Sequence, residues 1–152
     1  MLMVPRKKPQ SKNNPWRQRK RVAAYCRIST NSPAQLASLE QQIRAYKIVI
    51  EDNPAWELVG IYTDIASGLR LQQREGYKQL LRDCKRGKID MIIVKSMSRL
   101  GRDSLELIER IREWKAQGII LCLEIERINT MTADNFIIDV LAAQVQALAG
   151  GT

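Results

Sequence analysis

Hydrophobic and polar positions along the chain follow two alternating patterns. Short apolar runs typical of buried strands occupy residues 22–26, 56–62, 91–94 and 119–125. Between and after these runs, apolar residues recur every three or four positions, as on one face of a helix. Because strands and helices take turns along the chain, we predict an α/β fold. It should contain a mainly parallel sheet of four to five strands, with helices on both faces.

Capping residues mark where several of these helices begin and end. Ser32, Pro33 and Gln35 form a capping box at the start of the first helix, with proline at the first helical position. Gly87 fits a left-handed cap after the second helix, and Asp103 or Ser104 caps the third. We expect two helices to bury these faces: Leu36, Leu39, Ile43, Tyr46 and Ile50 in the first, and Leu105, Ile108, Ile111 and Trp114 in the third.

The composition is that of one soluble domain. The chain has 152 residues, of which 45% are hydrophobic, and its apolar runs are too short for a membrane span or a signal peptide. Three widely spaced cysteines, Cys26, Cys84 and Cys122, are expected to be free thiols in a reducing cytoplasm. Histidine is absent, which removes the commonest general base and the usual zinc ligands. We expect no metal and no cofactor.

Positive charge is concentrated in two places. Residues 1–21 carry eight Lys or Arg and no acidic residue, so they contribute +8 of the chain's formal net charge of +9. We predict that residues 1–20 form a disordered basic arm, which serves either as a solubilising extension or as a non-specific phosphate contact. Within the folded part, residues 70–102 hold ten basic and three acidic side chains. This middle region is the candidate surface for a polyanion.

Candidate chemistry lies where two predicted strands end. Arg27 and Ser29 come at the end of the first strand, and Arg99 and Arg102 follow the third. Ligands of open α/β sheets gather at the carboxyl ends of the strands, so these side chains are expected to share one crevice. Guanidinium groups bind phosphate oxygens in pairs and stay charged at any working pH. A hydroxyl among arginines suits attack on a phosphate.

Five segments, in this order and spacing, resemble the catalytic domain of the serine recombinases, a family that comprises resolvases, invertases and large serine integrases. They are Tyr-Cys-Arg-Ile-Ser-Thr (25–30), Ser-Leu-Glu-Gln-Gln (38–42), Tyr-Thr-Asp-Ile-Ala-Ser-Gly (62–68), Arg-Glu-Gly-Tyr (74–77) and Val-Lys-Ser-Met-Ser-Arg-Leu-Gly-Arg-Asp (94–103). The resemblance extends from about residue 21 to residue 146, and it implies a resolvase-like fold with a catalytic domain at 21–150.

The resemblance also implies a function and a set of roles. The chain would be a site-specific DNA recombinase in which Ser29 attacks a DNA phosphate and forms a 5′-phosphoseryl link. Arg27, Arg99 and Arg102 would hold the phosphoryl group, with support from Gln42, Ser67 and Arg74. Because the covalent link conserves the bond energy, rejoining needs no ATP. The implied partners are double-stranded DNA and further copies of the chain, as a dimer and as a tetramer in the active synapse, with no membrane and no small-molecule substrate.

Two departures from the family pattern bear on this interpretation. Resolvases have an aspartate just before the first arginine of the later motif, whereas this chain has Ser98, as in the large serine recombinases. The family's separate DNA-binding segment does not follow residue 146, so we expect a catalytic-domain fragment that binds DNA weakly. The apolar face of residues 136–148 is expected to form a dimer interface. The alternative is a catalytically degenerate domain that acts only in DNA or protein binding.

Each candidate also has a structural explanation. Ser29 can be a turn or cap residue, and Ser67-Gly68 a simple turn. Arg99 and Arg102 can form a solvated face with nearby acids, Arg74 can simply begin its helix, and Gln42 can be a surface residue. Tyr25, Tyr46 and the tryptophans are expected to pack in the core or on the surface.

Overall fold

The computed structural model describes residues 19–65, 74–101 and 104–131, with residues 140, 143 and 147 further on. The arm up to residue 18 and most of the predicted final helix lie outside the described residues. Strands and helices alternate in the described part as predicted, in this order: β1 (Lys20–Ile28), α1 (Pro33–Glu51), β2 (Trp56–Ile65), α2 (Glu75–Lys85), β3 (Met91–Val94), the 3-10 helix η2 (Met97–Arg99), α3 (Ser104–Ala116), β4 (Ile120–Leu123) and β5 (Ile128–Asn129).

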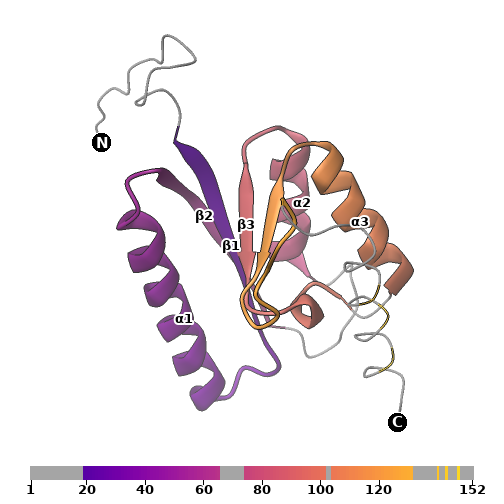
Figure 1. Ribbon diagram of the computed structural model, residues 1–152. Coiled ribbons are helices and arrows are strands. Elements are labelled where there is room, and N and C mark those ends of the chain that lie inside the picture. The colour runs from indigo at the N-terminus through magenta and orange to yellow at the C-terminus, as the bar shows by residue number, and fades with distance from the viewer. Residues whose placement is uncertain are drawn as a thin grey trace.

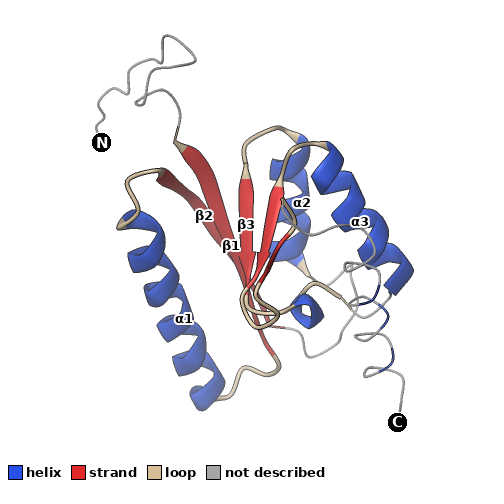
Figure 2. Cartoon of the chain, in the orientation of Figure 1, coloured by secondary structure: helices blue, strands red, loops and turns tan. Residues whose placement is uncertain are grey.

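The strands form one sheet in the order β2-β1-β3-β4-β5 (Figure 2). β1 pairs in parallel with both β2 and β3, and β3 pairs in parallel with β4, whereas β5 runs antiparallel to β4. The predicted mainly parallel sheet is therefore confirmed. β5 was not predicted, because two residues are too few to show a periodic pattern.

Helices cover both faces of the sheet, as predicted: α1 packs on one face, and α2 and α3 pack on the other (Figure 1). Successive residues of β1 point to opposite faces. Val22, Ala24 and Cys26 face the core under α1, and Ala23 and Tyr25 face the core under α2 and α3. Because β1 is buried on both faces, it reads as a continuous apolar run rather than an alternating one.

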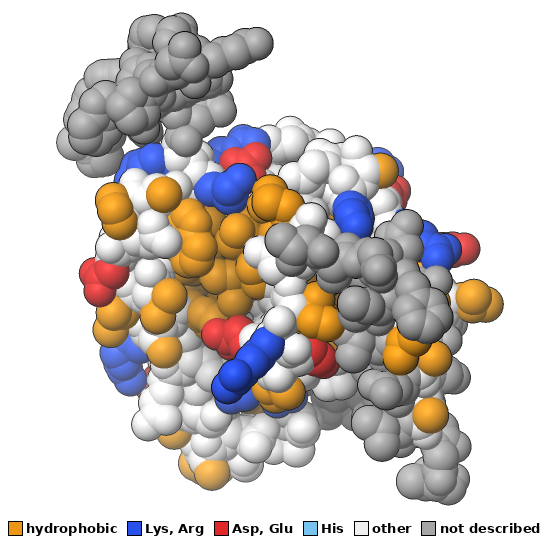
Figure 3. Space-filling model, in the orientation of Figure 1, with side chains coloured by type: hydrophobic (Ala, Val, Ile, Leu, Met, Phe, Trp, Pro, Cys, Tyr) orange, Lys and Arg blue, Asp and Glu red, His pale blue; other side chains and the backbone are white. Residues whose placement is uncertain are grey.

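On its own face of the sheet, α1 is the only described helix in the core cluster. Figure 3 shows hydrophobic side chains at the surface beside α1. The core under this helix also has half-buried members, namely Leu39, Trp56, Leu58, Ile61 and Cys122. None of the described helices is long and apolar enough to cross a bilayer.

Two predicted helix faces need correction. Leu36, expected to be buried, is 40% exposed, and Leu105 is 72% exposed. The other predicted residues of this face of α3 are confirmed, since Ile111 and Trp114 are buried and Ile108 packs against the core. Leu107 is buried with them in place of Leu105. Leu107 lies four positions before Ile111 and Leu105 three before Ile108, so helical spacing alone could not tell which leucine is buried.

The predicted helix ends are confirmed in the described part. Ser32 caps α1, its Oγ accepting from the N–H of Gln35 at 3.2 Å, with Pro33 at the first helical position. Gly87 follows α2 with φ 74°, in the left-handed region that glycine adopts without strain.

Candidate active site

The carboxyl ends of β1 and β3 bring two of the predicted arginines together. These strands are neighbours in the sheet, and each continues into a segment with a candidate residue. Arg27 Nη2 donates to the carbonyl of Ser98 at 3.1 Å, and Arg99 Nη1 donates to the carbonyl of Arg27 at 3.3 Å. Two stretches that lie about 70 residues apart in the sequence are thus tied to each other at one edge of the sheet.

Ser29 lies one residue beyond the end of β1 and is exposed. Its backbone N–H donates to Oε1 of Gln35 at 3.1 Å, so the first turn of α1 fixes the segment that carries the hydroxyl. Only half of the predicted capping box forms, because the Gln35 amide reaches Ser29 while the N–H of Ser32 donates to Thr30 Oγ1 at 3.3 Å. Gln35 is therefore a residue of the site that we had interpreted as a cap alone.

Arg74 does more than begin its helix. It is 5% exposed, and its guanidinium donates to the carbonyl oxygens of Leu100 at 2.6 Å and Arg99 at 3.1 Å. These carbonyls belong to the segment after β3, residues 95–101, which we call the arginine turn. Arg74 thus holds the backbone of Arg99 and Leu100 in place.

A buried polar network surrounds Arg74. Its Nη2 and Nε lie 3.0 and 3.3 Å from the hydroxyl of Tyr25, and its guanidinium stacks 4.0 Å from the ring centroid of Tyr77. The Tyr25 hydroxyl donates to Asp64 at 2.7 Å. Burial raises the pKa of the Tyr25 phenol well above its usual value, so it stays protonated and can bridge the carboxylate and the guanidinium.

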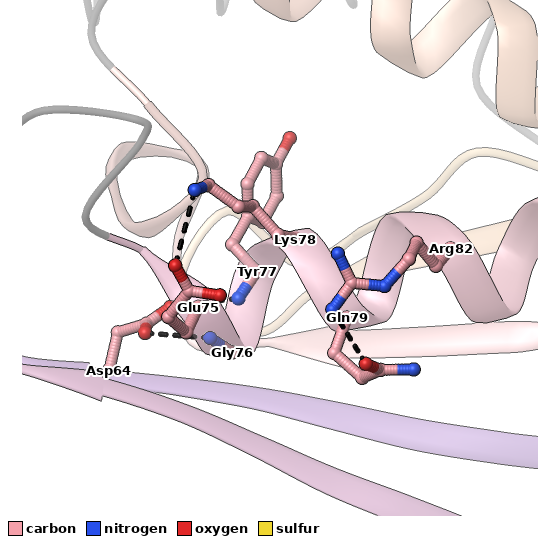
Figure 4. Close-up of polar contacts among 7 residues, drawn as sticks. All are labelled: Asp64, Glu75, Gly76, Tyr77, Lys78, Gln79 and Arg82. Atoms are coloured by element: carbon pink, nitrogen blue, oxygen red, sulfur yellow. Dashed lines mark hydrogen bonds and ion pairs between the residues drawn. The ribbon is translucent and has the colours of Figure 1, made fainter.

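Asp64, at the end of β2, also holds the start of α2. Its carboxylate accepts from the backbone N–H groups of Gly76 and Tyr77, both at 2.9 Å, and Figure 4 shows it facing the first turn of that helix. A carboxylate favours this position because the N–H groups of a first turn have no partner within the helix. No role was predicted for Asp64, although it lies in the segment 62–68 that resembles the serine recombinases, and that resemblance is the signal that could have pointed to it.

The thiol closest to Ser29 in the sequence, that of Cys26, is a poor nucleophile. Cys26 is 2% exposed, and burial raises the pKa of its thiol to about 11, with a smaller contribution from Glu124. A thiol attacks as its thiolate, so Cys26 is inert near neutral pH. All three cysteines are free.

The remaining predicted residues are not brought to this edge by the described contacts. Gln42 is half-buried on α1, and its amide donates to Ser38 Oγ of the same helix at 3.4 Å. Ser67 and Arg102 lie outside the described residues. The described part of the site therefore brings Arg27 and Arg99 together beside the segment that carries Ser29, a combination suited to holding a phosphodiester.

Comparison with known proteins agrees with this arrangement. Residues 22–148 match the family described as "Resolvase, N terminal domain". The Tn3 transposon resolvase of Escherichia coli is 34% identical over 128 residues, which cover 84% of this chain and 63% of the relative. The chain thus spans a little under two thirds of that relative's length.

Two solved structures share the fold. One is a resolvase family site-specific recombinase from Streptococcus pneumoniae, with a TM-score of 0.67, 26% identity, and coverage of 88% of this chain and 90% of that one. The other, the N-terminal catalytic domain of TP901-1 integrase, gives 0.63 at 21% identity, covering 86% and 96%. The family match covers most of the chain, and we conclude that this chain belongs to the resolvase family, whose N-terminal domain it contains.

Proposed function

We propose that this chain is the catalytic domain of a serine-type, site-specific DNA recombinase. The observation that carries the proposal is the meeting of Arg27 and Arg99 next to Ser29, where two parallel strands end. Membership of the resolvase family, with a Tn3 resolvase among its relatives, supports it. The three free cysteines are in keeping with a reducing cytoplasm.

The proposed reaction is the one that the resemblance to the serine recombinases implies. The Ser29 oxygen attacks the phosphorus of one DNA phosphodiester and loses its proton, the P–O3′ bond breaks, the leaving oxygen takes up a proton as a 3′-hydroxyl, and the 5′-phosphate stays bonded to Ser29. Arg27, Arg99 and Arg102 neutralise the charge on the non-bridging oxygens, which lowers the barrier without a proton transfer of their own. A 3′-hydroxyl then attacks the phosphoserine, and the strand is rejoined with no net loss of high-energy bonds.

Covalent attachment to DNA tests this function. The protein is incubated with a pool of duplexes of randomised sequence and with supercoiled plasmid, and denaturing gels reveal adducts. Ser29→Ala should abolish the adduct, whereas Thr30→Ala, which removes the adjacent hydroxyl, should retain it. Arg27→Gln and Arg99→Gln should slow its formation by about 100-fold or more. An adduct that persists in Ser29→Ala would overturn the proposal, and the lack of any adduct would favour a degenerate binding domain.

We further propose that the protein works as a dimer that pairs into a tetramer when two DNA sites meet. Two duplexes must be cut and exchanged in one complex, so several copies of Ser29 have to act together. Sedimentation at rising protein concentration should show self-association, which DNA should strengthen. A strictly monomeric protein at high concentration, with and without DNA, would contradict this.

A further inference from the structure

The arginine turn (residues 95–101) is held at its outgoing end by side chains already described. Arg74 binds the carbonyls of Arg99 and Leu100, and Arg27 binds the carbonyl of Ser98. Its incoming end has a different anchor. Ser96 occupies the capping position of η2, yet its side chain makes no cap hydrogen bond, and its hydroxyl instead pairs with that of Ser98 at 2.9 Å.

A carboxylate from another element takes over at the incoming end. The N–H of Met97, a fully buried residue, donates to Oε2 of Glu126 at 3.1 Å. Glu126 lies in the loop between β4 and β5, residues 124–127, 29 positions further along the chain. The Met97 N–H therefore finds its acceptor in a residue far along the chain and not in a neighbouring serine.

The loop that carries Glu126 is itself fixed against the end of β3. The N–H groups of Glu124 and Ile125 donate to the carbonyls of Val94 and Lys95 at 3.0 and 2.8 Å. Arg127 then turns the chain with φ 59°, and β5 pairs back on β4. A side chain on so constrained a backbone can act as a fixed support rather than a mobile surface group.

The second carboxylate oxygen of Glu126 indicates that an acceptor oxygen, and not the negative charge, is what the contact with Met97 needs. Oε1 is buried and accepts no hydrogen bond from the part of the chain that the structure describes. The only described hydrogen bond of this carboxylate is thus the one to Met97, so a glutamine of the same length could replace it, whereas alanine could not.

We propose that Glu126 is a positioning residue, which anchors the Met97 N–H and so orients the arginine turn for Arg99 to meet the phosphate. The effect on catalysis rests on the proposed function, whereas the hydrogen bond that anchors Met97 rests on the observed contacts alone. Glu126 acts through Arg99 and does not itself touch the reacting atoms.

Hydrogen exchange tests the anchor without any need for activity. In Glu126→Ala, the amide of Met97 should exchange at least about tenfold faster, because its acceptor is gone, while Glu126→Gln should restore protection. Glu124→Ala is the matched control. It removes a carboxylate from the same loop, but one that binds the hydroxyl of Tyr46 on α1 at 2.6 Å. Unchanged Met97 exchange in Glu126→Ala, with the fold intact, would refute the anchor.

A double-mutant cycle tests the positioning role. Glu126→Ala should slow adduct formation by about 10- to 100-fold in the wild-type background, and Glu126→Gln should recover most of that loss. In an Arg99→Gln background, Glu126→Ala should cost little more, because the group it positions is already gone. Effects that simply multiply would overturn the role. If the wild-type protein forms no adduct at all, the proposed function fails, and the exchange result still decides the anchor.

Discussion

The hydroxyl of Tyr25 joins two opposite charges that are buried near the ends of β1 and β2. It donates to the Asp64 carboxylate and accepts from the Arg74 guanidinium. Neither charge would be tolerated alone in the core. Together they form a neutral, hydrogen-bonded unit that spans β1, β2 and the start of α2, and this unit carries the backbone of Arg99.

Tyr25→Phe tests that unit at a single atom. The ring and its packing remain, but Asp64 loses a donor and Arg74 loses an acceptor, so the free energy of unfolding should fall by about 2 kcal/mol. Urea unfolding measures this change. Because Arg74 binds the backbone carbonyls of the arginine turn, a displaced Arg74 should also slow adduct formation. A variant as stable as wild type would show that the hydroxyl is dispensable.

The Arg21–Asp90 pair gives the protein a predictable acid sensitivity. Hydrogen bonds from Arg21 lower the pKa of Asp90 below its usual value. A depressed folded-state pKa stabilises the fold above the unfolded-state pKa of about 4, and that stability is lost as the pH falls through the folded value.

Asp90→Asn should therefore cost about 1 kcal/mol near pH 6, a modest figure because both side chains are more than a third exposed. The difference from wild type should shrink as the pH is lowered from 5 towards 3. Urea unfolding at several pH values gives the curve. A difference that stayed constant with pH would contradict the assigned pair.

Among the elements, α2 sits unusually close to β2, and one glycine permits it. A Cβ built on Gly76 would lie 2.2 Å from the carbonyl oxygen of Thr63, inside any normal contact. The same closeness allows the Gly76 N–H to reach Asp64. The segment Arg-Glu-Gly-Tyr thus needs glycine at position 76 because a side chain would clash with the backbone of Thr63, and not because the backbone adopts a positive φ.

Gly76→Ala should push the first turn of α2 away from β2 and lower the free energy of unfolding by about 3 kcal/mol. Arg74 precedes this turn, so adduct formation should fall too. Gly101→Ala is the matched control for stability, because no atom of the residues that the structure describes lies within 4 Å of its added Cβ. If thermal unfolding shifted equally for both variants, the close approach would not be the cause.

Local sequence patterns predicted most of the strands and helices. They could not predict the hydrogen bonds between residues that lie far apart in the sequence. The strand at 91–94 was predicted with the bounds that β3 has, because an apolar run of this length between polar residues is too short for a helix. The Tyr25–Asp64 bond joins residues 39 apart, and the Met97–Glu126 bond joins residues 29 apart. No local sequence pattern indicates such pairs. The buried network around Arg74 and the contact of Glu126 with Met97 could therefore be identified only from the three-dimensional structure.

Over the whole molecule, the charge of +9 predicts how binding to DNA depends on salt. Affinity for a duplex of random sequence should fall steeply as salt rises, because bound cations release counterions from DNA. Arg27→Gln and Arg99→Gln should each reduce the slope of log affinity against log salt by about 1. Fluorescence anisotropy measures it.

Arg110→Gln is the control for this experiment, since Arg110 lies on α3 and pairs with Glu113 at 2.7 Å. It should leave the salt slope unchanged. A slope insensitive to Arg27 and Arg99 would mean that DNA does not reach the edge of the sheet where β1 and β3 end.

Ser29 is proposed to form the covalent bond to DNA, and mass spectrometry of the trapped adduct identifies the residue that carries this bond. Trypsin cleaves after Arg27 and Arg44 and releases one peptide, residues 28–44, that contains all the competing hydroxyls of this segment: Ser29, Thr30, Ser32 and Ser38. Fragment ions should place a nucleotide phosphate on Ser29. A phosphate on any other residue, within this peptide or outside it, would contradict the account.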